Sequence, residues 1–151
     1  MPNLSLANTI TSKPEHRQLL DIIDANFSSS NEGFAGIDAT LGVTGKRLSV
    51  LATDDEGYAR QNFTVTPGIT YSVSFKWIQV GGGSQGAGQF KLGSTNGGIE
   101  YVGGEFAYNA ATTTQSGLTF VTTGPNMYLR LQTDVDTKVT YWDDIKILEL
   151  K

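Results

Sequence analysis

The chain has 151 residues, 38% of them hydrophobic, and its 15 Asp and Glu outnumber 11 Lys and Arg to give a net charge of −4. This length fits one domain with one core, and the scattered Lys and Arg form no basic stripe that could neutralise phosphates, which argues against a nucleic-acid partner. No stretch approaches the roughly 20 apolar residues that cross a bilayer, and the absence of cysteine excludes disulfides, thiolate nucleophiles and Cys-ligated zinc.

Residues 1–25 differ from the rest of the chain and are predicted to form an N-terminal arm. Ser12 fits the N-cap of a short helix, with Pro14 in its first turn and Glu15 completing a capping box. Leu19–Ile23 would lie on one side of this helix or, alternatively, form the first strand of a sheet, because a short apolar run fits both. The first residues lack the features of a secretory signal, so we expect folding in the cytoplasm or a signal already removed.

From Phe27 onward, apolar and polar residues alternate with the two-residue period of β-strands. This alternation is clear in residues 61–66. Pro67-Gly68 then fits the centre of a type II turn, and apolar residues alternate with polar ones through residues 69–77. These features predict a β-hairpin made of the two segments, with Trp77 in the apolar row of the core.

The remaining strands are expected in short segments separated by turns, which suits a chain with 18 glycines. They are residues 89–94, 99–102, 105–109, 118–122, 127–133 and 138–148. The glycine-rich stretch 81–88 lacks the Lys and the following helix of a phosphate-binding loop and is predicted to be a flexible loop. Many short strands without intervening helices predict an all-β domain, built as a sandwich or a barrel.

The last predicted strand combines an apolar row, a carboxylate and a tryptophan. Strand alternation places Asp143 in one row with the apolar residues Val139, Tyr141, Ile145 and Ile147. A carboxylate in a buried row must be paired, hydrogen-bonded or metal-bound, because burying it alone costs several kcal/mol. Trp142 lies in the opposite row and is therefore predicted to be exposed.

A candidate binding surface follows if this last strand pairs with residues 127–133. In that segment the apolar residues Met127, Leu129 and Leu131 form the inward row, so Tyr128, Arg130 and Gln132 face outward. Pairing would bring these three side chains close to Trp142. Sugars bind flat aromatic faces, with amide and guanidinium groups holding the hydroxyls. The surface is therefore predicted either to bind a glycan or to pack under a loop or against another subunit.

Three segments together resemble the jelly-roll carbohydrate-binding modules appended to xylanases and glucanases, whose relatives also appear in phage virion proteins. They are residues 26–34, residues 63–75, and residues 128–131 leading to 142–147. The resemblance extends from about residue 20 to the end of the chain, although residues 78–117 match no binding pattern of these modules. It implies a two-sheet antiparallel jelly-roll β-sandwich over residues 26–151, preceded by the arm or short helix of residues 1–25.

The resemblance also implies a structural calcium ion near the last strand, with Asp143 among its ligands. Calcium takes six to eight oxygens, so Asp143 would join backbone carbonyls of the first loop. The alternative is that Asp143 accepts backbone N–H groups at a strand bulge without any metal. The acidic run Asp54-Asp55-Glu56 could also attract calcium, but it is predicted to be a solvated turn.

Catalysis is not expected. His16 is the only histidine and lies in the predicted arm, which argues against a Ser-His-Asp triad and against a site with several histidine ligands. Glycosidases need two carboxylates facing each other across a cleft. Glu100 and Glu105 lie in a plausible strand region, but no feature of the sequence brings them together.

Two non-enzymatic functions remain. The first is a phage virion structural protein, a capsid decoration or cement protein whose arm docks on a capsid or other virion neighbour. It would form a homo-oligomer and assemble in the host cytoplasm, which needs no secretion signal. The alternative is a carbohydrate-binding module, an extracellular protein that recognises a polysaccharide through Trp142, Tyr128, Arg130 and Gln132. The first explains the arm, and the second explains the aromatic and polar surface.

Overall fold

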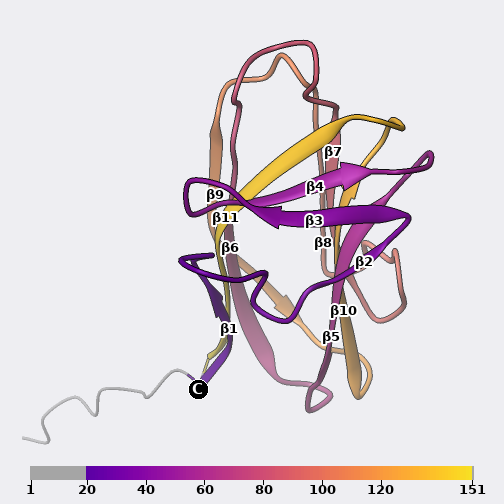
Figure 1. The fold of residues 1–151 in the computed structure, drawn as a ribbon. Coiled ribbons are helices and arrows are strands. Elements are labelled where there is room, and N and C mark those ends of the chain that lie inside the picture. The colour runs from indigo at the N-terminus through magenta and orange to yellow at the C-terminus, as the bar shows by residue number, and fades with distance from the viewer. Residues whose placement is uncertain (1–19, 151) are drawn as a thin grey trace, which may run out of the picture.

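The computed structural model describes residues 20–150, and in this range the fold is all-β, as predicted (Figure 1). The strands are β1 (Leu20–Ala25), β2 (Ala35–Ile37), β3 (Ala39–Val43), β4 (Leu48–Ala52), β5 (Tyr58–Thr64), β6 (Thr70–Trp77), β7 (Gly88–Gly93), β8 (Val102–Phe106), β9 (Thr113–Val121), β10 (Asn126–Thr133) and β11 (Val139–Leu150). They form two antiparallel sheets that pack as a jelly-roll-like sandwich. Over the same residues there is no helix long and apolar enough to cross a membrane.

The first sheet has six strands, and β11 is at its centre. Its order is β3-β4-β11-β6-β9, and β1 also pairs with β11. Residues Val139–Trp142 of β11 pair with β4, whereas residues Ile145–Glu149 pair with β1. The two short strands therefore follow one another along a single edge of β11, while β6 pairs with the other edge.

The second sheet has five strands in the order β2-β5-β10-β7-β8. Neighbouring strands in this sheet come from distant parts of the chain, because the central strand β10 pairs with β5 on one side and with β7 on the other. Alternate side chains of β10 point into the sandwich, and Met127, Leu129 and Leu131 are fully buried. The predicted inward row of this strand is confirmed.

Aromatic side chains from both sheets fill the middle of the sandwich. Phe75 of β6 stacks on Phe90 of β7 with ring centroids 3.7 Å apart. Trp77 is fully buried, as predicted, and packs against Phe106 of β8 and Trp142 of β11. Fully burying one large apolar side chain stabilises the fold by about 1.5–3 kcal/mol. This cluster therefore accounts for a large part of the attraction between the two sheets.

The prediction for the rows of β11 is wrong, because a β-bulge interrupts the alternation. Two residues of β11, Asp144 and Ile145, lie opposite the single residue Phe75 of β6, and Asp144 has a positive φ of 47°. An extra residue shifts every later side chain to the other face. Thr140 and Trp142 therefore point into the core before the bulge, and Ile145 and Ile147 do so after it. Val139, Tyr141 and Asp143 are only half-buried.

The predicted hairpin of residues 61–66 with 69–77 is also wrong. Strand β5 belongs to the five-stranded sheet, whereas β6 belongs to the six-stranded sheet. The turn itself is present: Gly68 has a φ of 81°, and its N–H donates to the carbonyl of Thr122 at 2.7 Å. Alternation identifies which face of a strand is buried but not which strand lies beside it, so the same pattern fits a connection between two sheets.

Residues 20–25 resolve the alternative left open for the segment around Leu19–Ile23. They form strand β1, which pairs antiparallel with β11 from the Leu20–Glu149 pair to the Ala25–Ile145 pair. The last residues of the predicted arm are thus part of a sheet. The proposed helix start at Ser12–Glu15 and the rest of the arm lie outside the described residues.

Candidate functional site

The outer face of the five-stranded sheet carries most of the candidate binding residues. In the row that crosses β5, β10 and β7, Arg60 lies opposite Arg130, and Arg130 lies opposite Lys91. The next row holds Tyr58, Gln132, Gln89 and Glu105. These residues alternate with buried core residues on the same strands, so their side chains point away from the sandwich. We call this surface the polar face.

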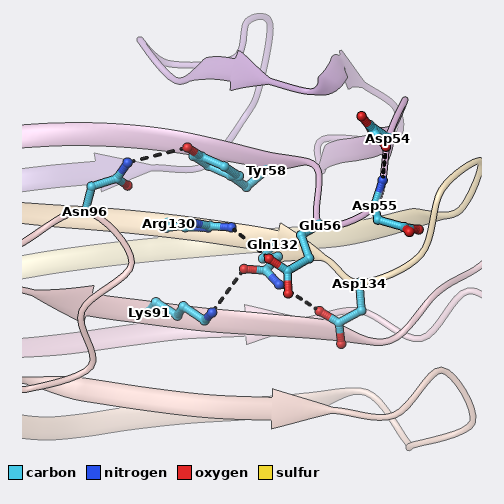
Figure 2. Close-up of polar contacts among 9 residues, drawn as sticks. All are labelled: Asp54, Asp55, Glu56, Tyr58, Lys91, Asn96, Arg130, Gln132 and Asp134. Atoms are coloured by element: carbon cyan, nitrogen blue, oxygen red, sulfur yellow. Dashed lines mark hydrogen bonds and ion pairs between the residues drawn. The ribbon is translucent and has the colours of Figure 1, made fainter.

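Arg130 lies at the centre of the polar face. Its guanidinium carbon is 3.6 Å from the centroid of the Tyr58 ring, a cation–π contact between β10 and β5. The Arg130 side chain is 14% exposed, and its Nη2 atom lies 4.0 Å from a carboxylate oxygen of Glu56. Figure 2 shows these residues and the neighbouring polar contacts. This contact holds the guanidinium over the Tyr58 ring.

The loop of residues 94–101 lies over part of the polar face. The amide nitrogen of Asn96 donates to the Tyr58 hydroxyl at 3.4 Å, which joins the loop to β5 (Figure 2). Within the loop, a Glu100 carboxylate oxygen accepts the N–H of Ser94 at 3.3 Å, and the Ile99 side chain is 62% exposed. This loop thus forms a wall beside the outer surface of β7 and β8.

A depression of about 750 Å³ lies between this wall and strands β7 and β8. Its polar lining residues are Gln89, Lys91 and Glu105, and its apolar wall residue is Ile99. Gly103 of β8 faces the outer surface without a side chain, and Ile99 packs over it. Ligand sites in proteins typically measure about 300–1,000 Å³ and hold a few placed polar groups. The depression therefore has the size and chemistry of a small binding site.

Gln132 connects the depression to the end of the sheet. Its amide oxygen accepts a hydrogen bond from the Lys91 ammonium at 3.1 Å, and its amide nitrogen donates to Asp134 at 3.1 Å (Figure 2). Burial raises the pKa of the Asp134 carboxyl above its usual value, and the hydrogen bond from Gln132 opposes that rise. Gln132 therefore positions Lys91, which lines the depression.

The structure separates the residues that were predicted to form one surface. Strands β10 and β11 belong to different sheets, so Trp142 does not lie beside Tyr128, Arg130 and Gln132. Tyr128 and Arg130 are partly exposed on the outer face, as predicted. Gln132 belongs to the same outer row but is only 1% exposed, because Lys91 and Asp134 pack around it.

Trp142 is a core residue, and the prediction that it is exposed is wrong. Its side chain is fully buried, and its Nε1–H donates to the Thr140 hydroxyl at 2.9 Å. The Thr140 and Thr133 hydroxyls are 2.8 Å apart, and Thr133 donates to the carbonyl of Val50 at 2.8 Å. Each hydroxyl has one proton, so Thr140 must donate to Thr133. The tryptophan therefore ends a buried chain of hydrogen bonds that links both sheets.

Asp143 lies at the bulge of β11. Its Oδ1 atom accepts the N–H of Asp144 at 2.8 Å, which is the contact expected if the carboxylate stabilises a bulge. Asp144 points to the outer surface, where it forms an ion pair with Lys76 at 2.7 Å. Among residues 20–150 there is no group of three His, Asp or Glu side chains that could hold a metal. A calcium ion at Asp143 would need backbone carbonyls for most of its ligands.

The calcium prediction can be tested by chelation. If Asp143 holds a structural calcium, EGTA should lower the Tm of the protein, because the ion binds the folded state only. The Asp143→Asn variant should then have a lower Tm that no longer responds to EGTA. Differential scanning calorimetry of both proteins measures this effect. An unchanged Tm of the unsubstituted protein would contradict the prediction.

The acidic turn Asp54-Asp55-Glu56 matches its prediction as a solvated turn. All three residues are exposed, and the Asp54 carboxylate accepts the N–H of Asp55 at 2.8 Å (Figure 2). The Glu56 carboxylate also lies close to the Arg130 guanidinium. The turn thus contributes one carboxylate to the border of the polar face.

Comparison with solved structures identifies the architecture. The carbohydrate-binding module CBM1 of BiXyn10A matches with a TM-score of 0.56 and 15% identity, over 83% of this chain and 94% of that one. A variant of the family 29 module CBM29-2, complexed with cellulohexaose, matches with a TM-score of 0.58 and 14% identity, over 84% and 87% of the two chains. This chain has the fold of a carbohydrate-binding module.

Modules of families 4, 22 and 35 also match this carbohydrate-binding-module-like chain. A cyclase from Fischerella sp. TAU matches as well, with a TM-score of 0.60 and 14% identity, over 87% of this chain and 98% of that one. No protein-family model and no curated protein matches the sequence. At these identities the likeness establishes the fold, so the function has to be argued from the site.

Proposed function

We propose that this protein is a non-catalytic carbohydrate-binding module that holds a polysaccharide on the polar face. The observation that carries the proposal is the depression of about 750 Å³ over β7 and β8, lined by the polar side chains of Gln89, Lys91 and Glu105. Amide, carboxylate and ammonium groups beside an apolar side chain, Ile99, suit the hydroxyls and C–H groups of a sugar chain. The CBM29-2 structure named above is a complex with cellulohexaose, which is in line with this proposal.

The proposal keeps part of the predicted site and replaces the rest. Arg130 stays at the centre of the polar face, held by Tyr58, and Gln132 acts by positioning Lys91. Trp142 is removed from the ligand surface because it is buried. The modules among the matched structures are non-catalytic domains, in agreement with the prediction that the chain is not an enzyme.

The test is affinity electrophoresis through gels that contain soluble xylan, glucan, mannan or a uronate polymer. We expect retarded mobility in at least one of these gels. The double variant Gln89→Ala/Glu105→Ala should raise the dissociation constant about tenfold or more, since each lost hydrogen bond to a ligand costs about 0.5–1.5 kcal/mol. Isothermal titration calorimetry with the retarding polymer measures this change.

The control is a double variant on the outer surface of the other sheet. Ser72 of β6 and Thr119 of β9 lie opposite each other there and point away from the core. Ser72→Ala/Thr119→Ala should bind as the unsubstituted protein does. A polysaccharide site on the polar face would be contradicted if the two double variants lost the same affinity for the polymer. It would also be contradicted if no gel retarded the unsubstituted protein.

The predicted virion role gains no support from these comparisons, which favour the alternative prediction of a carbohydrate-binding module. Docking of residues 1–25 on a capsid neighbour, assembly into a homo-oligomer, and location in the virion or outside the cell stay predictions.

A further inference from the structure

Three cations form one row across the polar face. Arg60 on β5, Arg130 on β10 and Lys91 on β7 are successive partners in the sheet, and all three side chains point outward. Neighbouring strands are about 4.8 Å apart, so the outer two backbones are separated by about 10 Å. The whole chain has 11 Lys and Arg against 15 Asp and Glu. The row is thus a local excess of positive charge on an acidic protein.

This arrangement works against stability. Like charges that lie directly opposite each other on neighbouring strands destabilise a sheet, and the row contains two such pairs, Arg60 with Arg130 and Arg130 with Lys91. In the part of the chain that the structure describes, neither Arg60 nor Lys91 forms an ion pair that would offset the repulsion. Such a cost is common where a site needs the charges for binding.

Arg130 also has an unused hydrogen-bond donor. Its Nε atom is buried and has no hydrogen-bond partner among residues 20–150. Leaving a buried donor unsatisfied is costly, and guanidinium groups pair preferentially with carboxylates through two parallel hydrogen bonds. Because Nε is buried, a ligand carboxylate would act on the row through its charge and through the exposed part of the guanidinium, not through Nε.

The neighbouring rows indicate on which side such a carboxylate would lie. The protein carboxylates Glu56, Glu105 and Asp134 are on the side of the row that holds Tyr58 and Gln132, whereas the Glu100 carboxylate lies over Gly93 on the other side. On the other side the row Asn62, Tyr128 and Gly93 carries no charge. An acidic group of a ligand would meet no like charge over Asn62 and Tyr128, at the end of this row away from Glu100.

We propose that the polar face selects polysaccharides that contain uronic acids, with the row Arg60, Arg130 and Lys91 binding their carboxylates. This inference rests on the proposed function and names the ligand class of the same site. Depressions flank Arg130 at both ends of the row: Arg60 lines one of about 340 Å³, and Lys91 lines the larger one over β7 and β8. Both outer cations are thus within reach of a ligand that crosses the face.

The experiment compares polymers that differ only in charge. Polygalacturonate, alginate and glucuronoxylan are each titrated beside their carboxyl-reduced forms, which keep the backbone but lose the carboxylates. We expect at least one charged polymer to bind about tenfold or more tightly than its reduced form. The difference should shrink as salt rises, because exposed charges are screened. Equal binding of charged and reduced forms would overturn the inference while leaving the proposed function intact.

A matched pair of variants separates the row from general charge attraction. Arg60→Gln/Lys91→Gln and Lys46→Gln/Arg47→Gln remove the same charge, but the second pair lies in the turn between β3 and β4. Only the first should lose the preference for charged polymers. Arg60→Gln alone should not lower the Tm, because it relieves repulsion.

Other outcomes are equally decisive. Selection of carboxylates by this row would be overturned if both double variants lost the same preference for charged polymers. It would also be overturned if dextran sulfate bound more tightly than every uronate polymer at equal charge. Failure of every polymer to bind, charged or neutral, would overturn both the inference and the proposed function.

Discussion

Trp142→Ala should destabilise the protein by about 3–5 kcal/mol, the range for removing a large aromatic side chain from a packed core. Trp142 is fully buried, and it contacts aromatic rings of both sheets. The substitution would also leave the Thr140 hydroxyl without its donor. Since domains are stable by only about 5–15 kcal/mol, much of the folding free energy would be lost. Urea unfolding followed by circular dichroism measures the change.

The control for this prediction is Tyr128→Ala, a truncation on the polar face. Tyr128 is half-buried and lies outside the aromatic core, so its loss should change the free energy of unfolding far less than that of Trp142. The comparison also separates a core role from a ligand role. If Trp142→Ala left the free energy of unfolding unchanged but reduced sugar binding, the placement of Trp142 in the core would be wrong.

Gly57→Ala should also destabilise the protein, by about 1–3 kcal/mol or more, because its methyl group has no room. A Cβ atom at Gly57 would lie 2.2 Å from the Asp38 carbonyl oxygen and 2.8 Å from Cα of Ala52. That carbonyl is fixed by a hydrogen bond from the N–H of Thr53. Both obstacles are backbone atoms, so the strands themselves would have to move apart. Thermal and urea unfolding measure the loss.

Gly124→Ala is the matched control, since a Cβ atom there meets nothing within 4 Å. We expect its stability to equal or slightly exceed that of the unsubstituted protein, because alanine reduces the freedom of the unfolded chain. Gly57 directly precedes Tyr58, which stacks on Arg130. The Gly57 variant should therefore also bind ligand more weakly, whereas the control should not. Equal stability of the two variants would contradict the packing around Gly57.

The sequence was sufficient to predict the fold class and several buried rows. Leu129 and Trp77 lie in strands whose alternation runs without interruption, so the buried face follows directly from the period. In β11 the same reasoning failed at one residue. The available signal was the pair Asp143-Asp144 in the middle of the strand, since Asp tolerates the positive φ that a bulge can require.

The binding surface could be predicted only in part. Arg130 and Tyr128 were found because their own strand shows clear alternation. Lys91 and Gln89 were missed, although they alternate with the buried residues Phe90 and Leu92 in the same way. The missing information was strand order: β10 lies between β5 and β7, which are far from it in sequence. Alternation within one strand carries no information about partners so distant along the chain.

The bulge also determines what kinds of change β11 can accept. Before Asp143 the strand is held in register by β4, and after Asp144 it is held by β1. The two halves of the strand are therefore anchored separately and meet at a fixed offset. A side-chain substitution leaves the register of the two halves unchanged. Deletion of one residue at the bulge would instead turn the side chains of one half to the other face, so that either Trp142 or Ile145 and Ile147 would become exposed. The structure of this strand therefore depends on the number of its residues as well as on their identity.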